Sequence, residues 1–129
     1  MLNMTGITKV SGAAPVQILY NVQNQMSVSI KLGKNFAGAV TENGRKIVKA
    51  GTPLTGDLTN RAVAFTAAGD SNAKGVLLHD VDVTDHDANA TLLIWGFVNL
   101  DRVDSATKAL LTTQVQTALA GRVYFLADN

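Results

Sequence analysis

The stretch that decides the fold is GVLLHDVDVTDHDANATLLIWGFVNL, residues 75–100. Two runs within it, 76–83 and 91–98, have the length of strands and are rich in aliphatic, β-branched and aromatic residues. The polar segment 84–89 between them is typical of a turn. The pattern predicts two antiparallel strands joined by a loop at the centre of the core. The core residues expected from it are Val76, Leu78, Leu92, Ile94, Trp95 and Phe97.

Upstream, the chain alternates between short strands and turns. Residues 26–32 alternate apolar and polar side chains, which indicates a strand with one buried face. After a short extended piece at 36–40, Asn43-Gly44 predicts a type I′ hairpin turn with a return strand at 45–50. Pro53 favours a strand start or an edge, because proline cannot donate to a ladder. A further short strand is expected at 60–65.

Downstream, the periodicity changes to that of a helix. Asp104 and Ser105 are both good N-cap residues, and 106–120 contains neither glycine nor proline. Apolar residues recur at helical spacing, so we expect one helix over about 105–119. Gly121 suits the position after its last turn, and residues 122–126 read as a final strand.

These elements predict one mainly β domain, a small barrel or sandwich propped by a late helix. At 129 residues the chain can bury a core without disulfides, and it contains no cysteine. Residues 1–25 mix Gly, Pro, Gln and Asn with scattered apolar residues, which is typical of an extended arm. We therefore divide the chain into an N-terminal arm, 1–25, and a β-rich domain, 26–129.

The charge pattern limits the partners. Charged residues make up only 16% of the chain, which suggests that part of the surface is buried against other chains. Residues 1–50 hold six basic residues and one acid, but the basic residues are dispersed and lack interleaved aromatics. We therefore expect no nucleic-acid partner. No apolar run is long enough for a membrane helix, and the N-terminal residues do not form a secretory signal.

One cluster could carry chemistry, the acidic segment with His79, Asp80, Asp82, Asp85, His86 and Asp87. Carboxylates and imidazoles bind divalent ions, so a metal-binding module or enzyme using this segment is an alternative. Strand alternation, however, separates His79 from Asp80 and Asp82. The segment also lacks the central glycine and distant glutamate of a calcium loop. We favour a solvated or intersubunit turn, and predict no catalytic, cofactor-binding or metal-binding residues.

The order of features from Lys46 onward resembles the head decoration (capsid-stabilising) proteins of tailed bacteriophages, the lambdoid family. The resemblance covers about two thirds of the chain. It lies in VKAGTPL at 48–54, AKGVLLHDVD at 73–82, ATLLI at 90–94, GFVN at 96–99, and a late helix before AG at 120–121 and an apolar terminal strand. The strand-like piece at 26–40 departs from some members.

The resemblance implies a β-tulip-like, non-enzymatic virion protein made in the host cytoplasm. Such proteins form homotrimers on the outer capsid surface and cement neighbouring major capsid protein subunits after the head expands. It also implies an N-terminal arm that orders on the shell, so deleting residues 1–20 is expected to spare the fold and abolish capsid binding. The apolar residues expected to add a strand to a capsid edge are Val16, Ile18, Leu19 and Val22. Some head-fibre proteins share such a domain, so the capsid-anchoring base of a head fibre, or another virion accessory domain, is the other structural reading.

Overall fold

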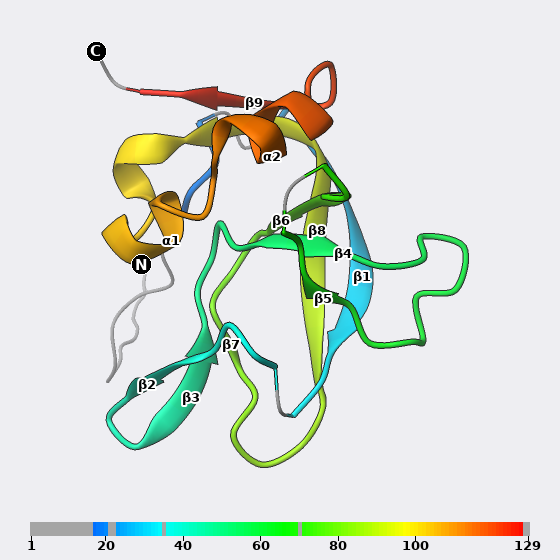
Figure 1. Ribbon diagram of the computed structural model, residues 1–129, viewed down its shortest axis with the longest axis vertical. Coiled ribbons are helices and arrows are strands. Elements are labelled where there is room, and N and C mark those ends of the chain that lie inside the picture. Colours follow the sequence, from blue (N-terminus) through cyan, green and yellow to red (C-terminus); the bar gives the residue numbers. More distant parts are fainter. Residues whose placement is uncertain (1–16, 21–22, 35, 70, 128–129) are drawn as a thin grey trace, which may run out of the picture.

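The computed structural model describes residues 17–20, 23–34, 36–69 and 71–127 of the chain. It confirms a mainly β domain with little helix (Figure 1). The strands are β1 Met26–Leu32, β2 Val40–Glu42, β3 Arg45–Val48, β4 Pro53–Thr55, β5 Thr66–Ala67, β6 Gly75–Leu77, β7 Val81–Asp82, β8 Ala88–Asn99 and β9 Val123–Leu126. The helices are a 3₁₀ turn η2 Leu100–Arg102 and two short α-helices, α1 Ser105–Lys108 and α2 Thr113–Ala118.

The long strand β8 organises the larger sheet, whose order is β1-β8-β6-β4-β5 with β9 added to β8. The first half of β8 lies antiparallel to β1 on one side and to β6 on the other. Its second half pairs in parallel with β9 and bridges antiparallel to Leu19. Within the described residues, only an isolated bridge between Leu32 and Phe65 joins the two ends of the strand path. The sheet therefore curls without closing into a barrel.

The smaller sheet has the order β2-β3-β7 and lies at the opposite end of the molecule from β9 (Figure 1). Its hairpin turns at Asn43 and Gly44, which both have positive φ, 53° and 77°. Glu42 pairs with Arg45 across this two-residue turn. The predicted type I′ hairpin is thus confirmed, because that turn requires positive φ at both central positions.

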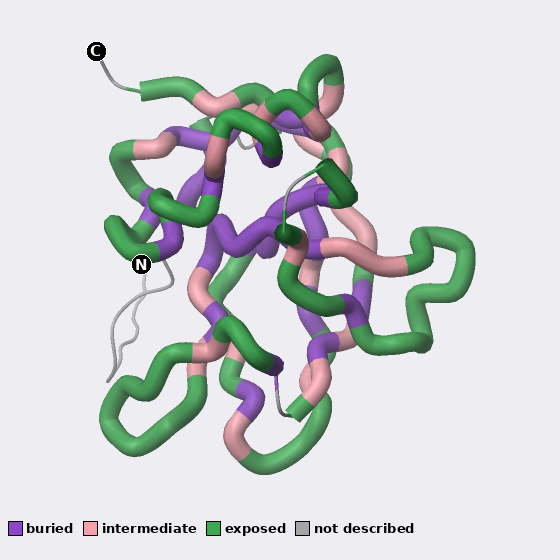
Figure 2. The backbone as a smooth tube through the Cα atoms, in the orientation of Figure 1, coloured by how far each residue is buried: buried purple, intermediate pink, exposed green. Residues whose placement is uncertain are grey.

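Both faces of the large sheet are buried around its centre, so the core has two parts (Figure 2). Leu93 and Val76 point to one face, where they join Val98 and the helix residues in the first cluster. Leu92 and Leu77 point to the other face and join the second cluster. Neighbouring strand residues face opposite sides of a sheet, so consecutive buried residues mark a strand that is covered on both faces.

The predicted strand over 76–83 is wrong in its second half. β6 ends at Leu77, and β7 pairs with β3 of the small sheet instead of with β8. The chain passes from the large sheet to the small sheet at Asp80. The Asp80 carboxylate accepts the Ala50 N–H at 2.7 Å, so the Ala50 N–H is bonded to a side chain instead of to a strand backbone. The antiparallel arrangement of 76–77 with 92–93 is confirmed.

The single helix expected over 105–119 is also wrong. The chain forms α1 and α2 instead, and Thr112 between them is extended at φ −69° and ψ 170°. Its hydroxyl accepts the Val115 N–H, so this side chain starts a second helix rather than continuing the first. Two further boundaries differ from expectation. Residues 61–63 form a turn or bend, with only Phe65 in a bridge before β5, and the piece expected at 36–40 becomes a strand at 40–42.

The predicted core is correct in part. Val76, Leu78 and Leu92 are buried, and Ile94 is half-buried against the second cluster. The prediction is wrong for Trp95, because 41% of this residue is exposed. Phe97 is only half-buried. The register explains the error. Met26 pairs with Trp95 but Ser27 pairs with Leu93, so β8 has one extra residue, a β-bulge that reverses the alternation beyond it.

Candidate functional site

The acidic segment is held by the basic residues of the β2–β3 hairpin. Arg45 donates to Asp82 at 2.8 Å and to Asp85 at 3.0 Å. Asp82 also accepts from the Thr84 backbone N–H. The hydrogen bond from Arg45, with those from Thr84, lowers the pKa of Asp82 to about 2. These contacts join the hairpin to the segment after β7.

A second group of charges links the same hairpin to Asp80. The Lys49 ammonium contacts Glu42 at 3.1 Å and Asp80 at 3.3 Å. Partial burial alone would lower the pKa of Lys49, but the two carboxylates outweigh it and the pKa is raised. Asp80 therefore holds Lys49 and the Ala50 N–H together where the chain passes between the sheets.

The remaining residues of the segment lie apart from these pairs. Asp87 accepts the Lys34 N–H at 2.9 Å, and the His86 ring contacts the Asp87 carbonyl. His79 is exposed. Across the described ranges, no three His, Asp or Glu side chains are grouped so that they could hold a metal ion. What the arrangement does is join loops through ion pairs.

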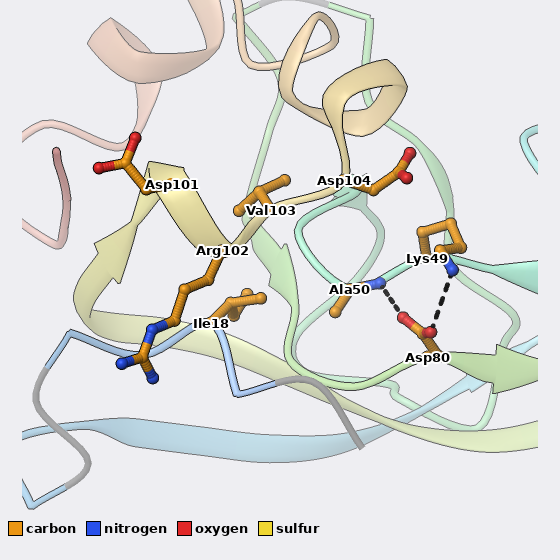
Figure 3. A pocket seen from close by; sticks show the side chains of 8 residues that line it. All are labelled: Ile18, Lys49, Ala50, Asp80, Asp101, Arg102, Val103 and Asp104. Carbon is orange, nitrogen blue, oxygen red and sulfur yellow. Dashed lines mark hydrogen bonds and ion pairs between the residues drawn. The ribbon is translucent and has the colours of Figure 1, made fainter. Parts of the chain in front are cut away.

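A small polar pocket of about 200 Å³ opens beside Asp80. Figure 3 shows the Lys49 and Asp80 side chains facing each other in this pocket, while Arg102 points away from them. Pockets for small molecules usually span about 300–1,000 Å³. This one therefore falls below the usual size for such a ligand. It is lined by Ile18, Lys49, Ala50, Asp80, Asp101, Arg102, Val103 and Asp104.

A larger apolar groove of about 320 Å³ lies at the far end of β1. Phe36 and Phe65 line it, and both belong to the second core cluster. Its other lining residues are small and uncharged. They are Gly33, Ala37, Ala64, Thr66 and Ala67.

Several exposed apolar side chains lie together where β8 and β9 run side by side. The Trp95 and Phe97 rings contact edge to face with centroids 6.0 Å apart, and Phe97 stacks on Tyr124 at 5.4 Å. The register adds residues of neighbouring strands to the same side, since Met26 pairs with Trp95 and Phe97 pairs with Tyr124. We term this surface the aromatic face. It comprises Tyr20, Met26, Trp95, Phe97, Tyr124 and Leu126.

The aromatic face continues the side of the sheet that carries the second core. Val28, Ile30 and Leu32 share their side of β1 with Met26, and they pack into or against that cluster. Met26 itself is 57% exposed. The described chain thus covers this side of the sheet at one end and leaves it open at the other.

The sequence pattern did not reveal this surface. Trp95 and Phe97 were expected in the core, and in the final strand Tyr124 is 45% exposed while Phe125 packs against the first cluster. In β9 the structure alternates, with Val123 buried and Tyr124 exposed, but the sequence Val-Tyr-Phe-Leu is apolar throughout and gave no signal of this. In β8 the bulge also hides the facing of the side chains, because their direction there depends on pairing with β1.

The residues expected to contact a capsid edge are placed differently from the prediction. Ile18 is fully buried and Leu19 is 4% exposed, and both belong to the first core cluster. The Ile18 carbonyl accepts the Asn99 N–H, and the Tyr20 N–H donates to the Phe97 carbonyl. These residues are therefore part of the folded domain and not of a free arm. Val16 and Val22 lie outside the described residues.

Comparison with known proteins adds no relative to this description. No family model matches the chain, and no curated protein matches it. In the part of the chain that the structure describes, no helix is both long and apolar enough to cross a membrane.

Proposed function

We propose that this chain is a head decoration protein of a tailed bacteriophage. It binds the outside of the expanded capsid as a homotrimer and stabilises contacts between major capsid protein subunits. The observation that carries the proposal is the aromatic face, because contiguous exposed apolar surface marks a site of contact with other proteins. The order of motifs from Lys46 onward supplies the identity of the partner through its resemblance to lambdoid decoration proteins.

Two further features support a protein whose function lies in its surface. Charged residues make up only 16% of the chain, so much of its surface can be desolvated at low electrostatic cost. The acidic segment is engaged in ion pairs with Arg45 and Lys49. Those contacts give its carboxylates a structural role.

Co-sedimentation with phage heads tests the proposal. We expect the purified protein to sediment with expanded, DNA-free heads and not with unexpanded ones. Heads loaded with the protein should also resist dissociation by heat or chelators better than bare heads. Absence of binding, together with equal stability of bare and treated heads, would refute the function.

A further inference from the structure

The aromatic face is large enough to form the centre of a stable protein interface. Five of its residues are substantially exposed: Met26 by 57%, Tyr20 by 51%, Tyr124 by 45%, Trp95 by 41% and Leu126 by 39%. Since aromatic side chains bury about 150–250 Å² each, together these residues offer on the order of 450 Å². A standard interface buries about 800 Å² per partner, of which about 56–65% is apolar area. The exposed area of the face is of the same order as that apolar part.

The chemistry of the face limits its occupant. The strand β9, Val123–Leu126, contains no charged residue, and neither does the second half of β8 over 94–99. A foreign partner is usually selected by complementary charges, and this surface offers none to complement. Interfaces between identical subunits are the most apolar class. The aromatic face of a second copy of this chain is therefore the partner surface that best matches its chemistry.

The orientation of the rings favours packing against the side chains of another protein over stacking with a flat ligand. Phe97 and Tyr124 turn their faces toward each other, with an interplanar angle of 17°, so their edges point outward. Trp95 meets Phe97 at 73°. The result is a ridged surface, which can interdigitate with another ridged surface. A sugar ring or a base would instead need an open aromatic face.

The edge of the sheet adds a second attachment. Among the described residues β9 has β8 as its one strand partner, so its outer edge faces no further strand. Proteins usually protect such an edge with lysine, proline or a bulge, and β9 carries none of these. The same strand that presents Tyr124 and Leu126 thus also presents backbone groups for pairing.

We infer that the aromatic face is the contact surface between copies of this chain. This inference deepens the proposed function and rests on it only for the number of subunits. Other surfaces of the chain then remain for contact with the capsid. The sedimentation and quenching measurements on the protein alone use no phage heads, so they can fail while the capsid function stands, and the reverse. Heads are added only in one later arm of the experiment.

The test combines mass with the fluorescence of Trp95, the sole tryptophan of the chain. By analytical ultracentrifugation, we expect the wild-type protein to sediment as a multiple of 13.6 kDa, with Trp95 protected from acrylamide quenching. Tyr124→Lys places a charge in the face and should weaken self-association at least tenfold, by about the effect of losing one interface hot spot. It should sediment at 13.6 kDa with Trp95 open to acrylamide.

Two further variants make the result specific. Met26→Lys, opposite Trp95 on β1, should act like Tyr124→Lys and covers the case in which that variant misfolds. Val63→Lys alters an equally exposed apolar residue, 59% exposed, in the loop between β4 and β5, and should leave the mass unchanged. Circular dichroism and thermal melting verify that each variant folds.

Several outcomes would overturn the inference. A monomeric wild-type protein at all concentrations would do so, as would an oligomer whose Trp95 is quenched as readily as in Tyr124→Lys. Protection of Trp95 that appears only when expanded heads are added would assign the face to the capsid. If Trp95 is protected from acrylamide in the monomer and deleting residues 1–16 removes that protection, the aromatic face would be assigned to contact with that segment of the same chain.

Discussion

Single residues decide which side of the sheet faces water. The extra residue between Leu93 and Trp95 shifts the alternation of β8 by one position, so Leu93 and Val98 share a core although they are five residues apart. Gly96, at φ 159°, lies within this shifted part, and a Cβ there would come within 3.1 Å of Leu93. Without the shift, Trp95 and Phe97 would lie on the side of Leu93. The aromatic face therefore exists because of a local irregularity that no periodic pattern shows.

Gly75 at the start of β6 has a steric requirement that can be tested. A Cβ at this position would collide with the Leu93 carbonyl oxygen and press on the Leu92 side chain. We expect Gly75→Ala to lower the free energy of unfolding by about 2–3 kcal/mol, measured by denaturant unfolding. Gly69→Ala is the matched control, because nothing lies within 4 Å of its added methyl group, and it should change stability by less than about 0.5 kcal/mol. Equal effects of the two substitutions would contradict this packing.

The ion pair between Arg45 and Asp82 predicts a pH dependence. The pKa of Asp82 is about 2 in the folded protein, below the ordinary 3.8, so its contribution to stability is complete above about pH 4. That contribution is lost as the pH falls through about 2. Arg45→Gln removes the largest cause and should return the carboxyl titration toward pH 3.8, as followed by NMR of the Asp82 side chain. Lys108→Gln, in α1, should leave it near 2, and an Asp82 that titrates near 3.8 in the wild type would contradict the pairing.

At the scale of elements, local chemistry was easier to predict than pairing. The Asn43-Gly44 turn, the strand β1, the start of β4 at Pro53 and the glycine after α2 all follow from nearby residues. The break after β6 does not, because it depends on Asp80 reaching Ala50, thirty residues away. The ion pairs of the acidic segment are likewise set by a hairpin distant in sequence. Sequence reasoning thus identified the segment but not what it contacts.

The division between α1 and α2 rests on Thr112. Its hydroxyl accepts the Val115 N–H at 3.3 Å, which caps a helix whose buried Val115 and Leu119 close the first core cluster. We expect Thr112→Ala to lower the free energy of unfolding by about 1 kcal/mol in thermal or denaturant melts. Thr113→Ala next to it is exposed and should change stability by less than about 0.5 kcal/mol. A neutral Thr112→Ala would indicate that the cap does not hold the helix.

The burial of Ile18 and Leu19 also moves the boundary of the arm. The expectation that residues 1–20 can be removed without harm is wrong, since that deletion takes two side chains out of the core. Deleting residues 1–20 should lower the free energy of unfolding by about 4 kcal/mol or more. Deleting residues 1–16 retains both side chains and should weaken binding to expanded heads. Full head binding by the shorter deletion would show that this segment is not needed for attachment.

At the scale of the whole molecule, the chain presents different surfaces in different places. One side of the large sheet is covered by the helices, and the other is covered at one end by the small sheet (Figure 1). The other end of that second side carries the exposed residues of the aromatic face. The apolar groove at Phe36 and Phe65 lies on the small-sheet side, in the part of the chain distant from β9. The proposed cement function requires one surface for copies of the chain and another for the shell. The aromatic face and this groove are two separate apolar surfaces.

Such an arrangement would let weak contacts act together. Subunits joined through the aromatic face would carry their capsid-binding segments as a set, so each added contact would form at high effective concentration. Stability of the shell would then depend on assembly of the decoration protein as well as on each contact. This links the inferred subunit interface to the proposed function.

Cryo-electron microscopy of expanded heads incubated with the purified protein tests the central claim most directly. The proposal predicts added density on the outer surface at threefold or quasi-threefold positions, into which three copies of this domain fit, and no such density on unexpanded heads. Expanded heads that remain bare at saturating protein would contradict it.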